Sequence, residues 1–567
     1  MTSTAVDAAD AGAPPRAVPA ETVLAETVPA AHATMAELDG PAPCGAVPSL
    51  EEIVRPFAET RRGITFLDGS NRRTVTYAEL AALAAAVAVR LRAAGVRPGD
   101  RVAGTADNDI DSVLLLMAVW SLGAAFVSLP PPSRRDAGRF AERFGGLLAS
   151  CGCGFLVTGE PDSQLAARAG LRVIPAASLR GLPPLPRGAG DAQLGDIALI
   201  QFTSGSVSAP KGVAIGSRAL ARHAAVLRRT LEASPERDRV VSWLPLYHDM
   251  GLVTMFLMPL AMRGDLVLMP PASFAFGPAR WLNTLARERG TLTAAPDFAY
   301  RMAATVPYDA GLDLSCVRVA LNGGERINRR TLEEFHRATE PFGLRREAVF
   351  PCYGLAENVV GVTTKALDEP AFFGPDGHVS VGHPVAGVSV RAPEGPPAGP
   401  LQLKGEFLFE GYYTGDGFVP TAPGQWHDTG DEGFVRDGRL YVIGRRAEVV
   451  CVAGRNVFAE DVEAAVHDSQ GADIRACAAF RLEGADQQFG LMLEVPPRPA
   501  RPPGEIRALG AGARAAVREA VGVRVATVLL VRPGTIPRTT SGKVQRSHCR
   551  ALQAEGQLAR KLLAAVE

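Results

Sequence analysis

One glycine-rich stretch has the composition of a phosphate-binding turn. Residues 201–215 read Gln-Phe-Thr-Ser-Gly-Ser-Val-Ser-Ala-Pro-Lys-Gly-Val-Ala-Ile. The apolar residues 197–202 predict a buried strand, and a second apolar run follows at 213–215. Between them, glycine lets backbone N–H groups approach an anion, hydroxyls add donors, and Lys211 supplies a mobile positive charge. A Ser/Gly-rich surface hairpin fits the same residues, since the glycine-to-lysine spacing is not that of the Walker motif.

A histidine and an aspartate follow another predicted strand. Residues 240–252 read Val-Val-Ser-Trp-Leu-Pro-Leu-Tyr-His-Asp-Met-Gly-Leu, which places His248 and Asp249 after the apolar run. Open α/β sheets bind ligands at the carboxyl ends of their strands, so this pair is a candidate for a binding site. A turn histidine capped by Asp249 is the plainer explanation of the same residues.

Two further strand ends combine small residues with a carboxylate. Residues 317–325 end in Asn-Gly-Gly-Glu, and residues 349–357 end in Tyr-Gly-Leu-Ala-Glu. A flat aromatic ring beside glycines suits a purine, and a carboxylate near a phosphate-binding turn suits Mg²⁺. Each segment could be a simple turn, but two of them in one predicted sheet favour a nucleotide site.

Two late segments carry an aspartate and a lysine of interest. In Trp426-His-Asp-Thr-Gly-Asp431, a buried carboxylate at Asp431 could accept both hydroxyls of a ribose, although a β-turn aspartate is the alternative. Residues 537–546 read Pro-Arg-Thr-Thr-Ser-Gly-Lys-Val-Gln-Arg. Taken alone, Lys543 on such a loop is more often a solvated surface lysine than a catalytic one.

The elements that must position these residues alternate between helix and strand. Residues 76–94 have helical periodicity and end at Gly95, and residues 112–122 predict a second, apolar helix. Short strands are expected near Val102 and at residues 124–129. This alternation predicts an α/β fold with mostly parallel sheets covered by helices on both faces.

The length of the chain predicts more than one domain. At 567 residues it exceeds one ordinary core. We expect a disordered Ala/Pro-rich leader over residues 1–48 and a large N-terminal domain over residues 49–443. Shorter strands and helices after Gly444 predict a small α+β domain over residues 444–567.

Composition excludes several classes of protein. Hydrophobic residues make up 47% of the chain and charged residues 21%, as in soluble globular proteins. Sixty basic residues balance sixty acidic ones, which gives no electrostatic reason to expect nucleic acid or an anionic membrane as a partner. The eight cysteines form no disulfide framework or paired metal motif, and no signal peptide or membrane-spanning run is evident. A cytoplasmic protein with free thiols is expected.

Five motifs in order resemble the adenylate-forming superfamily, which comprises acyl-CoA synthetases, peptide-synthetase adenylation domains and luciferases. The resemblance runs from roughly residue 50 to the end. Within the superfamily, residues 243–252, 295–300 and 454–463 are most similar to fatty acyl-AMP ligases. The five motifs are Thr203-Ser-Gly-Ser with Pro210-Lys-Gly, Tyr353-Gly-Leu-Ala-Glu357, Asp428-Thr-Gly-Asp431, Gly444-Arg445, and Pro537-Arg-Thr-Thr-Ser-Gly-Lys543.

The resemblance implies an activity. The enzyme would use ATP and Mg²⁺ to convert a carboxylic acid, expected to be a fatty acid, into an acyl adenylate with release of pyrophosphate. It would then pass the acyl group to the phosphopantetheine thiol of an acyl carrier protein, in a context such as natural product biosynthesis. Two alternatives stay open: an acyl-CoA ligase that uses CoA as acceptor, and a degenerate nucleotide-binding regulator.

The resemblance also implies roles for single residues. Lys543 would bridge the carboxylate and the α-phosphate, His248 would lie beside the carboxylate, and Glu357 would anchor Mg²⁺ together with Thr203. A hinge just after Gly444 would let the small domain rotate and remove the lysine before the thiol enters. The residues expected to bind ATP are Thr203, Ser204, Gly205, Ser206, Lys211, Gly324, Glu325, Tyr353, Asp431 and Arg445.

The sequence departs from the superfamily pattern in three places. Val207 stands where the phosphate-binding turn usually has threonine, which suggests weaker ATP binding. Ala447 stands where the hinge usually has lysine or aspartate, which puts the domain rotation or its tuning in question. The segment between Glu357 and Gly382 is shorter than expected of acyl-AMP ligases, whose insertion there is thought to hinder use of CoA.

Overall fold

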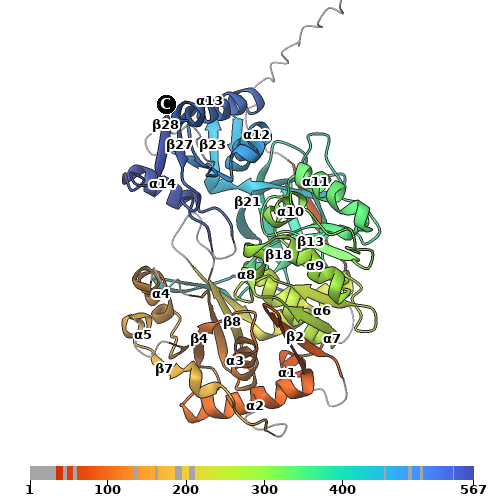
Figure 1. Ribbon diagram of the computed structural model, residues 1–567. Helices are drawn as coiled ribbons and strands as arrows, with labels where there is room; N and C mark the ends of the chain where they lie inside the picture. Colours follow the sequence, from red (N-terminus) through yellow and green to blue (C-terminus); the bar gives the residue numbers. More distant parts are fainter. Residues whose placement is uncertain are drawn as a thin grey trace, which may run out of the picture. The chain divides into compact units, whose positions relative to one another are not determined.

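The computed structural model describes most of the chain after residue 33 (Figure 1). The described residues are 34–42, 47–54, 61–131, 137–159, 164–185, 195–202, 211–452, 455–482, 488–497, 502–539 and 542–567. Helices alternate with strands through much of this length, and the strands form sheets with parallel cores. The α/β class expected from the sequence is therefore confirmed.

The larger sheet contains fourteen strands within the described ranges. Six neighbours, from β14 to β2 in the order below, pair in parallel. Strands β12 and β13 are buried at every residue, as expected when both faces of a parallel sheet are covered. In sheet order the strands are β1 (Met35–Asp39), β17 (Val388–Pro393), β18 (Gly399–Gly405), β21 (His427–Arg436), β22 (Arg439–Arg445), β16 (Ser380–Pro384), β15 (Gly361–Thr364), β14 (Val349–Gly354), β13 (Val319–Asn322), β12 (Leu292–Ala295), β10 (Arg239–Ser242), β11 (Asp265–Leu268), β2 (Gly63–Asp68) and β3 (Asn71–Thr76).

The second sheet holds the predicted strand–turn–strand unit. Strands β8 and β9 pair antiparallel, on either side of residues 203–210, which lie outside the described ranges. Beyond β8 the sheet continues in parallel through β5, β4, β6 and β7. In sheet order its strands are β20 (Gly417–Pro420), β19 (Gly411–Thr414), β9 (Gly212–Gly216), β8 (Ile197–Phe202), β5 (Ala125–Leu129), β4 (Arg101–Thr105), β6 (Phe155–Thr158) and β7 (Arg172–Pro175).

Helices cover these sheets. The predicted helix over residues 76–94 is α2, which begins with a capping box in which Thr76 and Glu79 satisfy each other's backbone N–H groups. The apolar helix expected at 112–122 is α3, which is buried continuously from Ser112 to Trp120. The helices before residue 340 are α1 (Leu50–Val54), α2 (Tyr77–Ala93), α3 (Ile110–Ser121), α4 (Ala137–Ser150), α5 (Gln164–Ala169), α6 (Ser217–Thr230), the π-helix η2 (Met250–Leu257), α7 (Met258–Met262), α8 (Pro271–Phe276), α9 (Ala279–Glu288), α10 (Asp297–Ala304) and α11 (Arg329–Thr339).

The last part of the chain builds its own small α+β unit. Its four-stranded sheet has the order β25 (Ala476–Arg481), β26 (Phe489–Glu494), β27 (Val525–Val531) and β28 (Leu562–Val566). A hairpin of β23 (Val449–Val452) and β24 (Arg455–Phe458) precedes it. The helices α12 (Ala459–Gln470), α13 (Pro503–Ala520) and α14 (Arg546–Ala554) complete the unit (Figure 1). Its apolar side chains form separate clusters, which agrees with a small C-terminal domain, while the boundary at residue 444 stays a prediction.

The predicted disordered leader over residues 1–48 needs a correction near its end. Met35–Asp39 forms β1, which pairs antiparallel with β17 over all five residues. The pairing satisfies backbone groups of a segment whose burial alternates along the strand. A low-complexity leader gives no local sign of such a distant partner, so composition alone could not reveal it.

A membrane span is not evident in the described part of the chain, because none of its helices is long and apolar enough to cross a bilayer.

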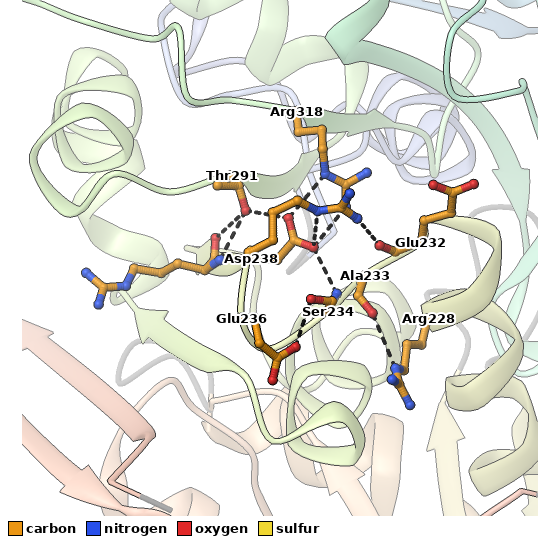
Figure 2. A network of polar contacts seen from close by, with 10 residues as sticks. Arg228, Glu232, Ala233, Ser234, Glu236, Asp238, Thr291 and Arg318 are labelled. Carbon is orange, nitrogen blue, oxygen red and sulfur yellow. Dashed lines mark hydrogen bonds and ion pairs between the residues drawn. The ribbon is translucent and has the colours of Figure 1, made fainter.

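A polar network joins the starts of three strands of the larger sheet (Figure 2). Asp238 directly precedes β10, and its Oδ1 accepts hydrogen bonds from Arg318 Nε at 3.2 Å and Thr291 Oγ1 at 2.9 Å. Its Oδ2 accepts from Arg318 Nη2 at 3.0 Å and from the Ser234 amide at 2.9 Å. Thr291 and Arg318 directly precede β12 and β13, so the network fixes the strand ends opposite to those expected to bind ligands.

Candidate active site

A single large cavity brings most of the predicted site residues together. Its volume is about 1260 Å³. The expected residues that line it are Lys211, His248, Gly324, Glu325, Tyr353, Glu357, Asp431, Arg445 and Lys543. Thr203, Ser204, Gly205 and Ser206, as well as Val207, lie outside the described residues. The structure therefore gathers residues that are more than 300 positions apart in the sequence, such as Lys211 and Lys543.

Asp431 lies between a tyrosine and an arginine. It stands in β21 opposite Arg445 in β22, whose Nε lies 2.8 Å from Asp431 Oδ1. The hydroxyl of Tyr353, in β14, donates to Asp431 Oδ2 at 2.6 Å. Burial raises the pKa of Asp431, although the Arg445 charge opposes this rise. Burial and the Asp431 charge raise the pKa of Tyr353, which keeps its hydroxyl a donor. The carboxylate is thus oriented, and its oxygens keep further lone pairs for sugar hydroxyls.

Glu357 is held by a residue that the sequence reasoning missed. It lies in the short helix η5 (Ala356–Asn358), just beyond β14. The hydroxyl of Tyr412, in β19, donates to Glu357 Oε1 at 2.7 Å. The Lys211 ammonium lies 4.8 Å from the centre of the Tyr412 ring, a cation–π distance. Strand β19 pairs with β9, which lies about 200 residues earlier in the chain. Tyr412 is brought to the site by this long-range pairing, so no local sequence pattern could have identified it.

The single carboxylate of Glu357 fits a Mg²⁺ ion whose other ligands come mostly from the substrate. Within the described ranges, no group of three or more His, Cys, Asp or Glu side chains could hold a metal ion alone. Mg²⁺ is commonly bound through one or two carboxylates, substrate phosphates and waters. One oriented carboxylate, Glu357, in the cavity that Lys211 also lines is the donor set expected of such a site.

His248 and Asp249 line the same cavity as Lys543 of the small unit. His248 Nδ1 lies 2.6 Å from Asp249 Oδ1, and Asp249 also caps the start of η2. Burial lowers the pKa of Lys543, whereas the nearby Asp249 charge acts in the opposite direction. Burial would raise the pKa of Asp249, but the charges of His248 and Lys543 outweigh it and the pKa is lowered. The sequence offered His248 and Asp249 either as a binding pair or as a capped turn; in the structure Asp249 is one of the acidic residues near Lys543, together with Glu325 and Asp431.

The loop that carries Lys543 is closed by backbone contacts. The Thr539 amide donates to the Lys543 carbonyl at 2.7 Å, and the Lys543 amide donates to Thr539 Oγ1 at 3.0 Å. The Gln545 amide donates to the Pro537 carbonyl at 2.9 Å. These contacts fix the backbone of Lys543 against Thr539, and Lys543 lines the cavity, whereas the residues alone would suggest a lysine on a solvated loop.

Gly324 and Glu325 have different surroundings. Gly324 has φ +82°, in the left-handed region that favours glycine. Glu325 Oε1 accepts a hydrogen bond of 2.6 Å from the amide of Phe298 at the start of α10. This contact gives Glu325 a structural task in addition to its place in the cavity wall.

Several apolar side chains line the cavity. Its wall includes Leu227 of α6, Met250 of η2, Met302 of α10, Leu321 of β13, Val360 and Val381. The apolar segment Met255–Leu260 belongs to the buried core. In the segment Ala272–Phe276, the ring of Phe274 stacks on that of Trp243 with centroids 4.1 Å apart, and Phe276 is 81% exposed. An apolar wall beside a polar site can accept a substrate with a hydrocarbon part.

Comparisons with known proteins show which proteins this chain is similar to. A family profile described as "AMP-binding enzyme" matches residues 54–413. The long-chain-fatty-acid–AMP ligase FadD26 of Mycobacterium bovis is 31% identical over 89% of this chain and 96% of its own length. The medium-chain-fatty-acid–[acyl-carrier-protein] ligase JamA of Moorena producens is 27% identical over 88% of this chain and 94% of its own length.

Solved structures show the same fold. One chain, from a study of fatty acyl-adenylate ligases from E. coli and L. pneumophila, superposes with a TM-score of 0.77 at 27% identity. The match covers 90% of this chain and 99% of that chain.

Proposed function

The chain belongs to the AMP-binding enzyme family, and from this premise we propose that it activates a fatty acid with ATP and transfers the acyl group to a carrier-protein thiol. The first product would be an acyl adenylate and pyrophosphate. The second step would form a thioester on the phosphopantetheine arm of an acyl carrier protein and release AMP. The names of JamA and FadD26 support a fatty acid as the substrate, and the name of JamA supports an acyl carrier protein as the acceptor.

The observation that carries the proposal is the meeting of Lys543 with the Asp431 group in one cavity. Lys543 comes from the small unit, whereas Asp431, Tyr353 and Arg445 come from strands β21, β14 and β22 of the larger sheet. A residue fixing the ribose and a cation facing the reacting phosphate are what adenylate formation requires, because two anions must be brought together.

The residues support a simple sequence of events. A carboxylate oxygen of the acid attacks the α-phosphorus, the bond to the bridging oxygen breaks, and pyrophosphate leaves. Both lysines line the cavity; in the proposed mechanism Lys543 would neutralise charge on the carboxylate and the α-phosphate, and Lys211 would bind the outer phosphates. Mg²⁺, held by Glu357 and the phosphates, would supply further charge neutralisation.

The chemistry of the second step requires a thiol as the acyl acceptor. A thiol loses its proton and attacks the carbonyl carbon, and AMP leaves. This step needs Lys543 to move out of the cavity, so we extend the proposal to a small domain that begins at residue 444 and rotates about a hinge there. CoA is the alternative acceptor, favoured by the short connection over residues 365–379 between β15 and β16. We place the protein in the cytoplasm, where the cysteines found free in the described residues would stay reduced.

One assay tests the proposal. Purified protein is given ATP, Mg²⁺ and carboxylic acids of graded chain length, with either CoA or a holo carrier protein as acceptor. Pyrophosphate release with a fatty acid and acyl transfer to the carrier protein alone is the expected result. Formation of acyl-CoA would reassign the acceptor, and absence of pyrophosphate with every acid would overturn the proposed activity.

A further inference from the structure

Two ion pairs connect the small unit to the segment that follows Glu325: one involves Arg326 and the other Arg330 of α11. Arg326 Nη1 lies 2.6 Å from Asp461 Oδ1, and the two side chains are 19% and 33% exposed. Arg330 Nη1 lies 2.5 Å from Asp468 Oδ1, but both of these side chains are about half exposed. Asp461 and Asp468 lie about two turns apart on α12 and therefore share one face of that helix.

The first pair is the stronger candidate for a functional role. Surface ion pairs contribute little, since water already solvates both charges, whereas partly buried pairs are less screened. Arg326 is also fixed from a second side, because its Nη2 lies 3.3 Å from His378 Nδ1. It directly follows Glu325 in the cavity wall, so Asp461 is joined to the edge of the substrate site.

Helix α12 is in turn joined to the catalytic loop through Arg546. This residue opens α14, about one helical turn beyond Lys543. Its Nε and Nη2 bind both oxygens of Glu463 at 2.8 Å, and its Nη1 lies 2.7 Å from Glu460 Oε1. Glu448, next to Ala447, is a third carboxylate partner. Such bidentate contacts restrict orientation as well as distance. Any shift of α12 is therefore passed to the segment that carries Lys543.

We propose that Arg326 is a positioning residue for adenylation: through Asp461, α12 and Arg546 it holds Lys543 over the acid and the α-phosphate. The inference rests on the proposed function, since it assumes that Lys543 serves the adenylation step. Rotation of the small domain separates Arg326 from Asp461, so the pair stabilises the adenylating arrangement and does not assist the thiol step.

Charge reversal and charge exchange test the proposal in the full-length protein. Arg326→Asp and Asp461→Arg alone are expected to lower kcat for pyrophosphate release about tenfold, with KM for ATP changed less than threefold. The double exchange restores the rate to within about threefold of the wild type. Transfer from a supplied acyl adenylate to the thiol stays unchanged or becomes faster in all three variants.

A matched control and a fold check accompany these variants. Glu333→Arg reverses a charge on α11 in a residue that pairs with Arg329 of the same helix, and it is expected to keep the wild-type rate. Thermal unfolding of each variant shows whether it is folded; if Arg326→Asp is not, Arg326→Gln takes its place with the same expected loss. Wild-type adenylation in the single variants, or no recovery in the double exchange, overturns the proposal.

A second readout separates this inference from the proposed function. Fluorophores placed through non-natural amino acids at Arg337 in α11 and Glu519 in α13 report the distance between the two parts without any turnover. Arg326→Asp is expected to lower the efficiency of energy transfer between the two fluorophores, because α11 and α13 move apart when the ion pair is lost. The double exchange is expected to restore the efficiency, even if no acid is activated. Unchanged transfer in Arg326→Asp would overturn the positioning role whatever the activity of the wild type.

Discussion

The hydroxyl of Tyr412 donates a 2.7 Å hydrogen bond to Oε1 of Glu357 and so ties the second sheet to the end of β14 in the larger one. The same ring carries the Lys211 ammonium on its face. One tyrosine thus orients both the carboxylate proposed for Mg²⁺ and the cation proposed for the phosphates.

Tyr412→Phe is expected to reduce adenylation about tenfold and to raise the Mg²⁺ concentration needed for half-maximal rate. The change removes a hydrogen bond to a charged group, of the order of 1.5–3 kcal/mol, while the ring that faces Lys211 remains. Pyrophosphate release measured across a Mg²⁺ titration checks this. Tyr413→Phe is the matched control, because the Tyr413 hydroxyl contacts Arg101 instead. An unchanged Mg²⁺ dependence in Tyr412→Phe would contradict the role.

Lys543→Ala is expected to lower adenylation by about a thousandfold or more, in the range found when a preorganised charge is removed from a reacting site. Burial lowers the pKa of this lysine because the charged ammonium is partly desolvated in the folded protein. Removing the side chain also removes this desolvation cost, so the melting temperature should hardly change. Transfer from a supplied acyl adenylate should persist. Lys561→Ala, at an exposed lysine of the same unit, serves as control. Undiminished pyrophosphate release by Lys543→Ala would remove it from the mechanism.

Much of the architecture could be predicted because local patterns of apolar and polar residues determine its helices and strands. The helical periodicity of residues 76–94 and the two apolar runs around residue 211 each have a counterpart in α2, β8 and β9. Most of the motif residues that line the cavity stand near the end of a strand or in a short turn, where the sequence pattern could suggest them, although Asp431 lies within β21.

What failed to be predicted depends on contacts between distant segments. Tyr412 reaches Glu357 only because β19 pairs with β9, and Met35–Asp39 becomes a strand only because β17 is available. Asp249 gains its importance from Lys543, almost 300 residues later. The Glu325 carboxylate accepts a hydrogen bond from the Phe298 amide at the start of α10, and the spacing of these residues in the sequence does not suggest this contact. Arg326 and Arg546 were absent from the expected site for the same reason.

Asp238→Asn is expected to lower the free energy of unfolding by about 3 kcal/mol, the cost of breaking a buried ion pair from one side. Burial would raise the pKa of Asp238, but hydrogen bonds from Arg318 and Ser234 outweigh it and the pKa is lowered. The substitution removes the negative charge that faces the Arg318 guanidinium, which binds both carboxylate oxygens of Asp238 in the network of Figure 2. Urea unfolding measures the loss, and Glu236→Gln at the exposed edge of the network is the control. KM for ATP should stay unchanged, and a large rise in KM would contradict the separation of this network from the site.

Asp297 predicts a pH dependence of stability that its amide variant should lack. Its Oδ1 accepts hydrogen bonds from Asn322 Nδ2 at 3.0 Å and the Asn328 amide at 3.3 Å, yet the residue is only 4% exposed. Burial, together with the nearby Glu325 charge, raises the pKa of Asp297 to about 7. Since this value lies above the unfolded one, the folded state binds the proton more tightly, and stability falls as pH rises from about 4 to about 7.

Between pH 5 and pH 8 the wild type should therefore lose on the order of 2 kcal/mol of unfolding free energy relative to Asp297→Asn, at 1.36 kcal/mol per pKa unit. Urea unfolding at several pH values, with the difference taken between the two proteins, cancels the groups that titrate equally in both. Asp416→Asn, at an exposed turn, should follow the wild type. Parallel curves for wild type and Asp297→Asn would mean that Asp297 is already ionised in the fold at pH 5, held so by the hydrogen bonds from Asn322 and Asn328 in spite of its burial.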